Sequence, residues 1–331
     1  MVTGGGGFIG SYLVRRLLHD GWSVTVVDTM VRGEERRLAA VINDVQLVSC
    51  DVRDEGALRG AFNGADVVFH LAAVNGTENF YKQPELVLDV GIRGAIAVMN
   101  AGRDAGVPDV VVASTAEVYQ AAATVPTSET VALTLPNSLN PRYSYGGSKI
   151  ASELIAFNYG QDHFRRVQVF RPHNVYGPDM GRKHVVPQLI LRAAEAALDV
   201  DRRNRGFDGR SIPFPIQGDG AETRAFCYVD DIVDGILTMY ALGEHRAIYH
   251  IGNDDEISIR GLVARISRVL GIVLDVQPGP AAEGGTPRRC PDISKMRALG
   301  YDPSIGLDEG LERTVAWYLD HRHDVVVNQL L

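Results

Sequence analysis

The chain has 331 residues, of which 45% are hydrophobic, and it carries a formal net charge of −8 at pH 7. This length can bury one large core or two moderate ones, so we expect two lobes. The negative charge argues against a nucleic-acid partner. No apolar stretch approaches the roughly 20 residues that span a bilayer, and no export signal precedes the first glycines, so we expect a cytoplasmic protein without a membrane partner.

Cysteines are too few and too scattered for a disulfide framework or a zinc cluster, since the chain holds only Cys50, Cys227 and Cys290. We therefore predict that all three are packing residues in a reducing compartment. We also expect no metal site.

In chain order, the first feature is a run of glycines that follows the short apolar segment 1–3. The run leads into a helical pattern over residues 11–18, so backbone N–H groups and a helix N-terminus can approach a pyrophosphate with no side chain in the way. The sequence therefore predicts a dinucleotide-binding turn. Two spacings fit it, namely Gly5, Gly7 and Gly10, or the wider Gly4, Gly7 and Gly10.

The next feature is a strand over residues 23–27 that leads into Asp28, eighteen residues after Gly10. A carboxylate at this position accepts hydrogen bonds from an adenosine ribose. It would repel a 2′-phosphate, so we expect NAD rather than NADP as cofactor. Arg32 is close enough in sequence to leave NADP open.

Apolar strands and helical segments then alternate in the manner of a parallel, doubly wound sheet of the Rossmann type. We expect helices over residues 84–105 and 148–159. The further expected strands cover residues 45–48, 66–71, 109–114 and 167–171.

Beyond Pro178 this alternation weakens, and prolines and glycines interrupt residues 212–220. We expect an NAD-binding domain over residues 1–175 and a smaller substrate-binding lobe over 176–331, with part of 225–255 returning to the main sheet. The charged stretch 199–209 is predicted to be an exposed loop. Arginines that could hold a phosphate there are Arg202, Arg203 and Arg205.

Candidate reacting groups lie where a doubly wound sheet places them, beyond the ends of strands. Thr115 follows the strand 109–114, so its hydroxyl can bond a substrate oxygen. Tyr145 and Lys149 are four residues apart at the start of a helix and hence on one face. A phenol is a poor base at neutral pH, but a nearby ammonium and a positive nicotinamide ring favour phenolate. This pattern indicates proton transfer during hydride transfer.

Together these motifs resemble the extended short-chain dehydrogenase/reductases, and specifically the NAD-dependent nucleotide-sugar epimerase/dehydratase family. The resemblance covers nearly the whole chain. It rests on the glycine run, Asp28, Asp51-Val52, His70-Leu71-Ala72-Ala73, residues 114–119, the Tyr145 and Lys149 pair, residues 171–178 and residues 224–231.

The resemblance implies a tightly held NAD that oxidises a nucleotide-diphosphate sugar at C4 and later returns the hydride, usually within a homodimer. The implied cofactor-binding residues are Gly4, Gly7, Phe8, Ile9, Gly10, Asp28, Asp51, Val52, Leu71, Ala72, Ala73, Ser114, Tyr145, Lys149 and Pro172. Asp51 and Val52 would flank the adenine. The implied substrate-binding residues are Asn75, Thr115, Ala116, Glu117, Asn174, Arg224 and one or both of Arg288 and Arg289. The arginines would neutralise the diphosphate.

Glu117 bears on the step that follows oxidation, because a C4 ketone acidifies the hydrogens at C3 and C5. In dehydratases of the family the corresponding glutamate is the base, and an acidic or hydroxyl residue before it protonates the departing oxygen. Here that neighbour is Ala116, which cannot donate a proton. Dehydration, C3 or C5 epimerisation and decarboxylation of a uronic acid all stay open, and a simple 4-epimerase is disfavoured without being excluded.

Departures from the family pattern are Gln120, where glycine is usual, and Gly91, where asparagine is common. His173 could donate to a substrate oxygen or bond the backbone instead. Two other classes stay open. One is an NAD(P)-sensing regulator of the same fold, which typically lacks the tyrosine or the lysine, and the other is a net reductase acting on a small ketone.

Overall fold

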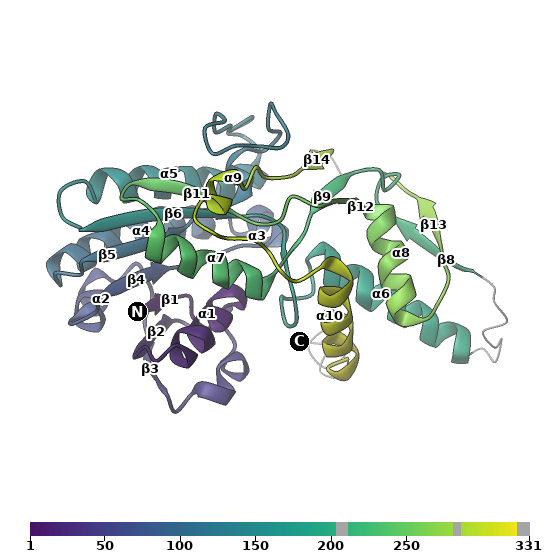
Figure 1. The fold of residues 1–331 in the computed structure, drawn as a ribbon, viewed down its shortest axis with the longest axis horizontal. Helices are drawn as coiled ribbons and strands as arrows, with labels where there is room; N and C mark the ends of the chain where they lie inside the picture. The colour runs from purple at the N-terminus through teal and green to yellow at the C-terminus, as the bar shows by residue number, and fades with distance from the viewer. Residues whose placement is uncertain (203–210, 281–285, 323–331) are drawn as a thin grey trace.

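The computed structural model describes residues 1–202, 211–280 and 286–322. A lobe built on a large sheet lies beside a smaller lobe made from later parts of the chain (Figure 1). In the described part of the chain, no helix is both long and apolar enough to cross a membrane. The three cysteines are free and buried.

The main sheet confirms the predicted Rossmann-type fold. Its seven strands are all parallel and lie in the order β11-β6-β5-β4-β1-β2-β3. The strand order reverses between β1 and β4, and ligands of such sheets bind beyond the strand ends at this switch point. The strands are β1 (Val2–Thr3), β2 (Val24–Asp28), β3 (Val45–Ser49), β4 (Val67–His70), β5 (Asp109–Ala113), β6 (Arg166–Pro172) and β11 (Ala247–Ile251).

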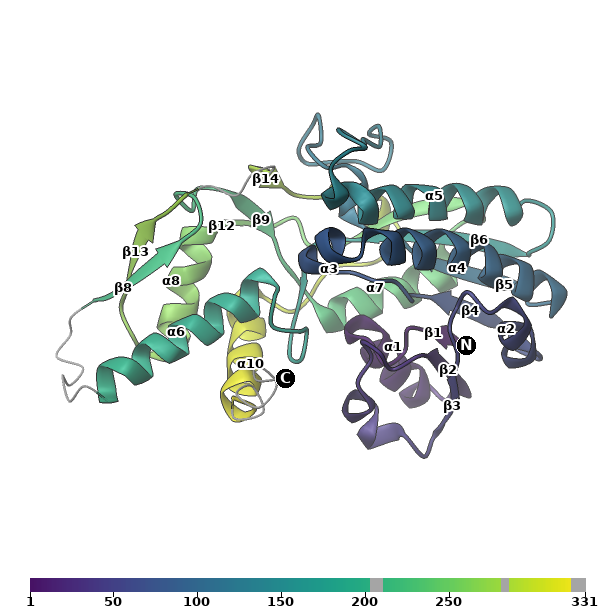
Figure 2. The same cartoon turned by 180° about the vertical axis from the view of Figure 1, so that it is seen from behind.

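Helices cover both faces of this sheet. On one face lie α2 (Glu55–Phe62), α4 (Pro84–Asp104) and α5 (Ser144–Tyr159), with α3 (Thr77–Lys82) at the end of α4 (Figure 2). The opposite face carries α1 (Phe8–His19) and α7 (Val229–Leu242) (Figure 1). Because both faces are covered, β4 and β5 are buried along their whole length, which explains their continuous runs of valine.

Two helices differ from the sequence prediction at their ends. α5 begins at Ser144 and not at 148, so Tyr145 already lies in its first turn. α6 (Val185–Arg202) extends into the predicted 199–209 loop, so that prediction is wrong for residues 199–202. Its alanines and leucines favour helix, which explains why the helix continues into the charged residues 199–202. Arg203 and Arg205 lie outside the described residues, as does the side chain of Arg202.

The second lobe is assembled from small sheets and three longer helices. Its strands are β7 (Val175–Tyr176) with β10 (Cys227–Tyr228), β8 (Ile212–Ile216) with β13 (Leu274–Pro278), and β9 (Thr223–Ala225) between β12 (Glu256–Ser258) and β14 (Arg288–Arg289). Its helices are α6, α8 (Ile259–Leu270) and α10 (Leu307–Asp320), whereas α9 (Ser294–Arg297) packs on β11 of the main sheet. Short 3-10 turns are η1 (Glu35–Arg37), η2 (Ala39–Val41), η3 (Ala116–Val118) and η4 (Pro141–Tyr143). Aromatic side chains of β7, β8 and β10 pack with α8 and α10 as the core of this lobe.

Gly10 offers a test of the first turn. A Cβ built on Gly10 would lie 2.1 Å from the Gly4 carbonyl oxygen. Gly10→Ala should therefore lower the free energy of unfolding by about 1–3 kcal/mol or more, because backbone atoms must move. The control is Gly60→Ala in α2, where a Cβ would meet no described atom within 4 Å. It should stabilise the helix by about 0.5–1 kcal/mol. Denaturant unfolding of both variants checks this, and equal effects would contradict it.

Candidate active site

The glycine turn adopts the wider of the two predicted spacings. Gly4 has a φ of +74°, and a Cβ there would lie 2.7 Å from the Ala72 nitrogen. The Gly7 N–H donates to the Gly4 carbonyl over 3.0 Å, and Gly10 packs on the same carbonyl. A Cβ on Gly5 would instead meet side-chain atoms of Val26. Gly4, Gly7 and Gly10 are therefore the positions at which backbone approaches backbone.

The N-terminus of α1 and the carboxylate of Asp28 meet at this turn. No described side chain caps Gly7, so the N–H groups of the first helical turn, including those of Phe8 and Ile9, point out of the helix end. Asp28 accepts from the Gly6 N–H and the Met30 N–H, each over 2.9 Å. Each carboxylate oxygen has a second lone pair for a ribose hydroxyl. These groups fit the pyrophosphate and adenosine ribose of NAD.

Other predicted cofactor residues surround the turn. Leu71, Ala72 and Ala73 follow β4, and the Ala72 N–H lies 3.4 Å from Thr3 Oγ1. Val52 is buried against Gly94 of α4. The Arg53 guanidinium bonds Asp51 and holds the pKa of that carboxyl below its usual value. Pro172 is the last residue of β6, so it lies where the carboxyl ends of the parallel strands meet.

Tyr145 and Thr115 lie close to each other beyond the end of β5, where Thr115 affects the pKa of the phenol. The Tyr145 ring stacks on Phe80 of α3, with ring centroids 5.3 Å apart. Burial raises the pKa of Tyr145 to about 12, and the charge of Glu117 adds to the rise, while Thr115 and Arg32 oppose it. The phenol therefore needs added positive charge before it can act as a base near neutral pH.

Lys149 does not bond the phenol. Its Nζ donates to the Ala113 carbonyl over 2.7 Å and is buried in the sheet lobe. Burial lowers the pKa of Lys149 to about 8, and the negative charge of Glu153 works against that fall. The ammonium thus remains mostly protonated at neutral pH, one helical turn from Tyr145.

A buried ion pair behind these groups escaped the sequence analysis. Glu153 forms a forked pair with Arg171 of β6, with Nε–Oε1 and Nη2–Oε2 distances of 2.8 and 2.6 Å. The Ser114 hydroxyl donates to the same Glu153 carboxylate. Glu153 lies four residues after Lys149, so the spacing of Tyr145, Lys149 and Glu153 on one helix face was a usable signal.

The His173 ring does not form the backbone hydrogen bond that was the second of its two predicted roles. Both ring nitrogens are buried without a hydrogen-bond partner among the described residues. The ring packs on His250 with centroids 4.6 Å apart. Burial, followed by the charges of His250 and Arg289, lowers its pKa well below the usual value. His173 is therefore a neutral packing residue in this structure.

Glu117 lies in a cluster of arginines. Its Oε1 accepts from Arg289 Nη1 of β14 over 2.6 Å. Burial alone would raise the pKa of Glu117, but the guanidiniums of Arg289, Arg142 and Arg224 outweigh it and hold the pKa below the usual value. Arg142 was not anticipated, and its buried Nε has no hydrogen-bond partner in the described part of the chain. The cluster holds more positive than negative charge and suits an anionic ligand.

Of the remaining predicted substrate residues, some lie near Glu117 and others do not. Arg224 bonds the Thr223 and Thr286 carbonyls and stays within electrostatic range of Glu117. Arg288 faces away and pairs with Glu256 on an exposed surface, because neighbours in a strand point to opposite sides. Asn174 donates to the Ala225 carbonyl over 3.0 Å. Asn75 accepts from the Gly76 N–H over 2.6 Å, and Ala116 is buried beside Glu117.

Both departures from the family pattern have local explanations. A Cβ on Gly91 would lie 2.6 Å from Ser148, so α4 and α5 approach too closely for a side chain there. Gln120 has a φ of +52°, the region that favours glycine. Its side-chain amide donates to the Glu117 carbonyl over 2.6 Å and helps to hold this conformation.

A doubly wound sheet with threonine, tyrosine and lysine converging beyond β5 defines a short-chain dehydrogenase/reductase. The model of the NAD dependent epimerase/dehydratase family matches residues 1–252. The chain therefore belongs to the NAD-dependent epimerase/dehydratase family of enzymes, and its cofactor is NAD. The predicted family resemblance is confirmed.

Relatives in this family carry out different reactions. A dTDP-4-dehydro-6-deoxy-D-allose reductase of a Streptomyces species is 32% identical over 97% of this chain and 96% of its own. A UDP-N-acetyl-alpha-D-glucosaminuronate decarboxylase of Bacillus cytotoxicus is 28% identical over 98% of both chains. The crystal structure of the dTDP-glucose 4,6-dehydratase DesIV of Streptomyces venezuelae, with NAD and TYD bound, is 32% identical over 97% of both chains, with a TM-score of 0.83.

The pairing of Arg289 with Glu117 can be tested directly. Arg289→Met should raise the pKa of Glu117, because the closest positive charge is removed while burial remains. Carboxyl-carbon NMR titration measures this, with Glu117→Gln identifying the resonance. Arg288→Met serves as the control, since Arg288 pairs with Glu256 instead. Equal shifts of Glu117 in both arginine variants would contradict the geometry.

Proposed function

We propose that this enzyme oxidises a nucleotide-diphosphate sugar at C4 to a 4-keto intermediate, with Thr115, Tyr145 and Lys149 as catalytic residues. The observation that carries the proposal is the convergence of Thr115, Tyr145 and Lys149 beyond β5, where Thr115 lowers the pKa of the buried Tyr145 phenol and Lys149 donates to the Ala113 carbonyl. When bound, NAD supplies the hydride acceptor and later the hydride donor. We also propose that the enzyme is a cytoplasmic homodimer without a nucleic-acid or membrane partner.

Tyr145 removes the proton of the C4 hydroxyl as that carbon loses its hydride. Thr115 bonds the same oxygen and orients it toward the phenol. The positive charges of Lys149 and Arg32 stabilise phenolate against the effect of burial. Asp28, the glycine turn and the first turn of α1 hold the cofactor, as their geometry allows.

Glu117 is our candidate base for the following dehydration or epimerisation at C3 or C5. The ketone acidifies hydrogens on the adjacent carbons, and the effect of Glu117 on Tyr145 supports their closeness. Because the Arg289 pair makes Glu117 a weaker base, substrate binding must loosen that pair. Ala116 has no proton to give, so in a dehydration Glu117 handles both protons or a water serves in its place.

Decarboxylation of a uronic acid is the second candidate, and the arginine cluster around Glu117 favours it. A guanidinium at this position can hold a sugar carboxylate in a forked geometry. After C4 oxidation the C5–carboxylate bond breaks, its electron pair enters the enolate of the ketone, and a proton then returns to C5. This route needs no base to remove a carbon-bound hydrogen. A simple 4-epimerase, the third candidate, would leave Glu117 without a chemical role.

Two other classes compete with this proposal, namely a net reductase and an NAD(P)-sensing regulator. The reductase would release its cofactor at each turnover, and the regulator would show no turnover at all. Retention of Thr115, Tyr145 and Lys149 counts against the regulator. The absorbance spectrum and extracted nucleotide of freshly purified protein separate the proposed enzyme from the net reductase. Retained NAD supports an internal redox cycle, whereas a requirement for added NADPH favours the reductase.

Tyr145→Phe tests the redox step. It should lower turnover about 10²–10⁴-fold, because it removes the proton-transfer group and leaves the nucleotide-binding turn intact. Turnover is measured by product formation, and NAD binding by calorimetry. Tyr143→Phe, two residues earlier in η4, is the control. Unchanged turnover in Tyr145→Phe would refute the assignment.

Glu117→Gln tests the second step with a panel of nucleotide sugars in deuterium oxide. The variant should still form the 4-keto sugar but should not exchange deuterium into C3 or C5. Mass spectrometry of the wild-type product separates loss of water, loss of carbon dioxide and no loss. If deuterium never enters the wild-type product and its mass is unchanged, a 4-epimerase is the better assignment.

A further inference from the structure

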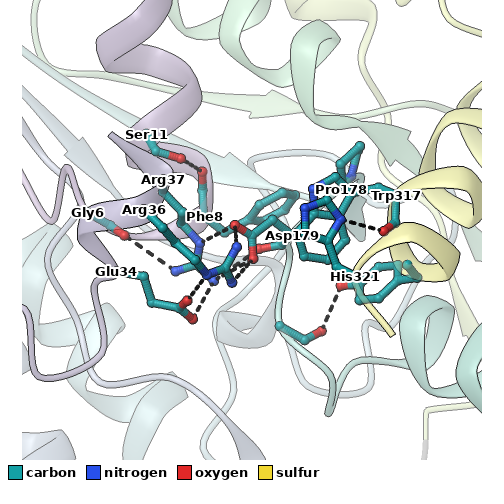
Figure 3. A network of polar contacts seen from close by, with 12 residues as sticks. Gly6, Phe8, Ser11, Glu34, Arg36, Arg37, Pro178, Asp179, Trp317 and His321 are labelled. Carbon is teal, nitrogen blue, oxygen red and sulfur yellow. Dashed lines mark hydrogen bonds and ion pairs between the residues drawn. The ribbon is translucent and has the colours of Figure 1, made fainter. Parts of the chain in front are cut away.

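Two segments from different lobes are joined beside the glycine turn by a cluster of charged residues that we call the clasp: Glu34, Arg36, Arg37 and Asp179 (Figure 3). Arg36 makes a fork on the Asp179 carboxylate, with Nη1–Oδ2 and Nη2–Oδ1 distances of 2.7 and 2.6 Å. Arg37 Nη2 donates to the Asp179 carbonyl over 3.1 Å. Glu34 pairs with both arginines.

The clasp is attached to the nucleotide-binding turn itself. The Gly6 carbonyl accepts from the Glu34 N–H over 3.0 Å and lies 3.4 Å from Arg37 Nη1. The Gly6 N–H donates to Asp28. Residues 29–37 therefore form a loop that is tied to the turn through Gly6 and to the second lobe through Asp179.

The second-lobe side of the clasp is also held in place. The Arg36 guanidinium lies over the Trp317 ring of α10, 5.5 Å from its centroid (Figure 3). The Tyr12 hydroxyl of α1 donates to the Pro178 carbonyl over 3.3 Å, and the Tyr318 hydroxyl donates to the Gly181 carbonyl over 3.4 Å. Asp179 therefore sits in a segment that is anchored on both sides.

Partial burial makes the clasp stronger than an ordinary surface pair. The side chains of Arg37 and Asp179 are only 8% and 15% exposed, although Arg36 is 49% exposed. Exposed ion pairs contribute little, so the largest contribution comes from the part-buried contacts of Arg37 with Asp179, and the half-exposed Arg36 fork adds to it. Opening the loop away from the second lobe would break several of these bonds at once.

We propose that the clasp slows the release of NAD by tying the 29–37 loop to the second lobe, with Asp179 as its central positioning residue. The inference rests on the proposed internal redox cycle, because a hydride that returns to the same sugar requires a cofactor that stays bound between the two transfers. The clasp acts on cofactor retention and not on the reacting atoms.

The test uses the full-length enzyme loaded with radiolabelled NAD and chased with unlabelled NAD. Asp179→Asn should release the label about tenfold faster than wild type, since charge-assisted hydrogen bonds are lost and affinity changes appear mainly in dissociation. Asparagine tolerates the φ of +63° at this position, so the backbone is kept. Rapid desalting followed by counting measures the rate.

The matched control is Asp254→Asn, which breaks a similar forked pair with Arg297 in α9. It should leave NAD release unchanged. Arg36→Lys retains the charge but loses the fork, so it should give a smaller increase than Asp179→Asn, and thermal melting checks that every variant is folded. Release at the wild-type rate from both clasp variants would overturn the proposal, and so would an equal increase in the control.

Failure of the proposed function would give a different result. Wild-type protein that purifies without nucleotide and turns over only with added NADPH would overturn the internal cycle. The label-release rates of wild type and Asp179→Asn, measured after loading, would still decide whether the clasp restrains the cofactor.

Discussion

Docking of α5 onto the end of β5 is the constraint on which the active site depends. Lys149 donates to the Ala113 carbonyl, Ser114 donates to Glu153, and Thr115 lies close enough to Tyr145 to lower its pKa. These contacts come from three successive turns of one helix face and from three consecutive residues of one strand end. α5 cannot slide or rotate without breaking all of them, so they place the phenol and the ammonium together.

Burial and charge then divide the site into two parts. The sheet lobe supplies Tyr145 and Lys149, whose pKa values are shifted in opposite directions because burial disfavours both phenolate and ammonium. The second lobe supplies Arg289, which reaches back to Glu117. The groups proposed for the oxidation therefore lie within the sheet lobe, whereas the carboxylate proposed for the second step pairs with an arginine of the other lobe.

Much of this arrangement was predictable because it depends on short spacings. The Rossmann-type sheet, the strand that precedes Thr115 and the shared helix face of Tyr145 and Lys149 all follow from local periodicity. Local pattern gave the wrong prediction for residues 199–202, where a helix continues into a charged stretch that was expected to be a loop. Local pattern also could not show which group the Lys149 ammonium contacts. Only the folded chain shows that this ammonium donates to the Ala113 carbonyl and not to the Tyr145 phenol.

The sequence by itself determined the fold, the nucleotide-binding turn and the identity of the catalytic candidates, since these depend on neighbours a few residues apart. Tertiary structure alone decided that Arg289 and not Arg288 pairs with Glu117, across 172 positions, and that Arg36 meets Asp179, across 143. Such pairs depend on how two lobes pack and on which side of a strand a residue faces. No local periodicity encodes that geometry.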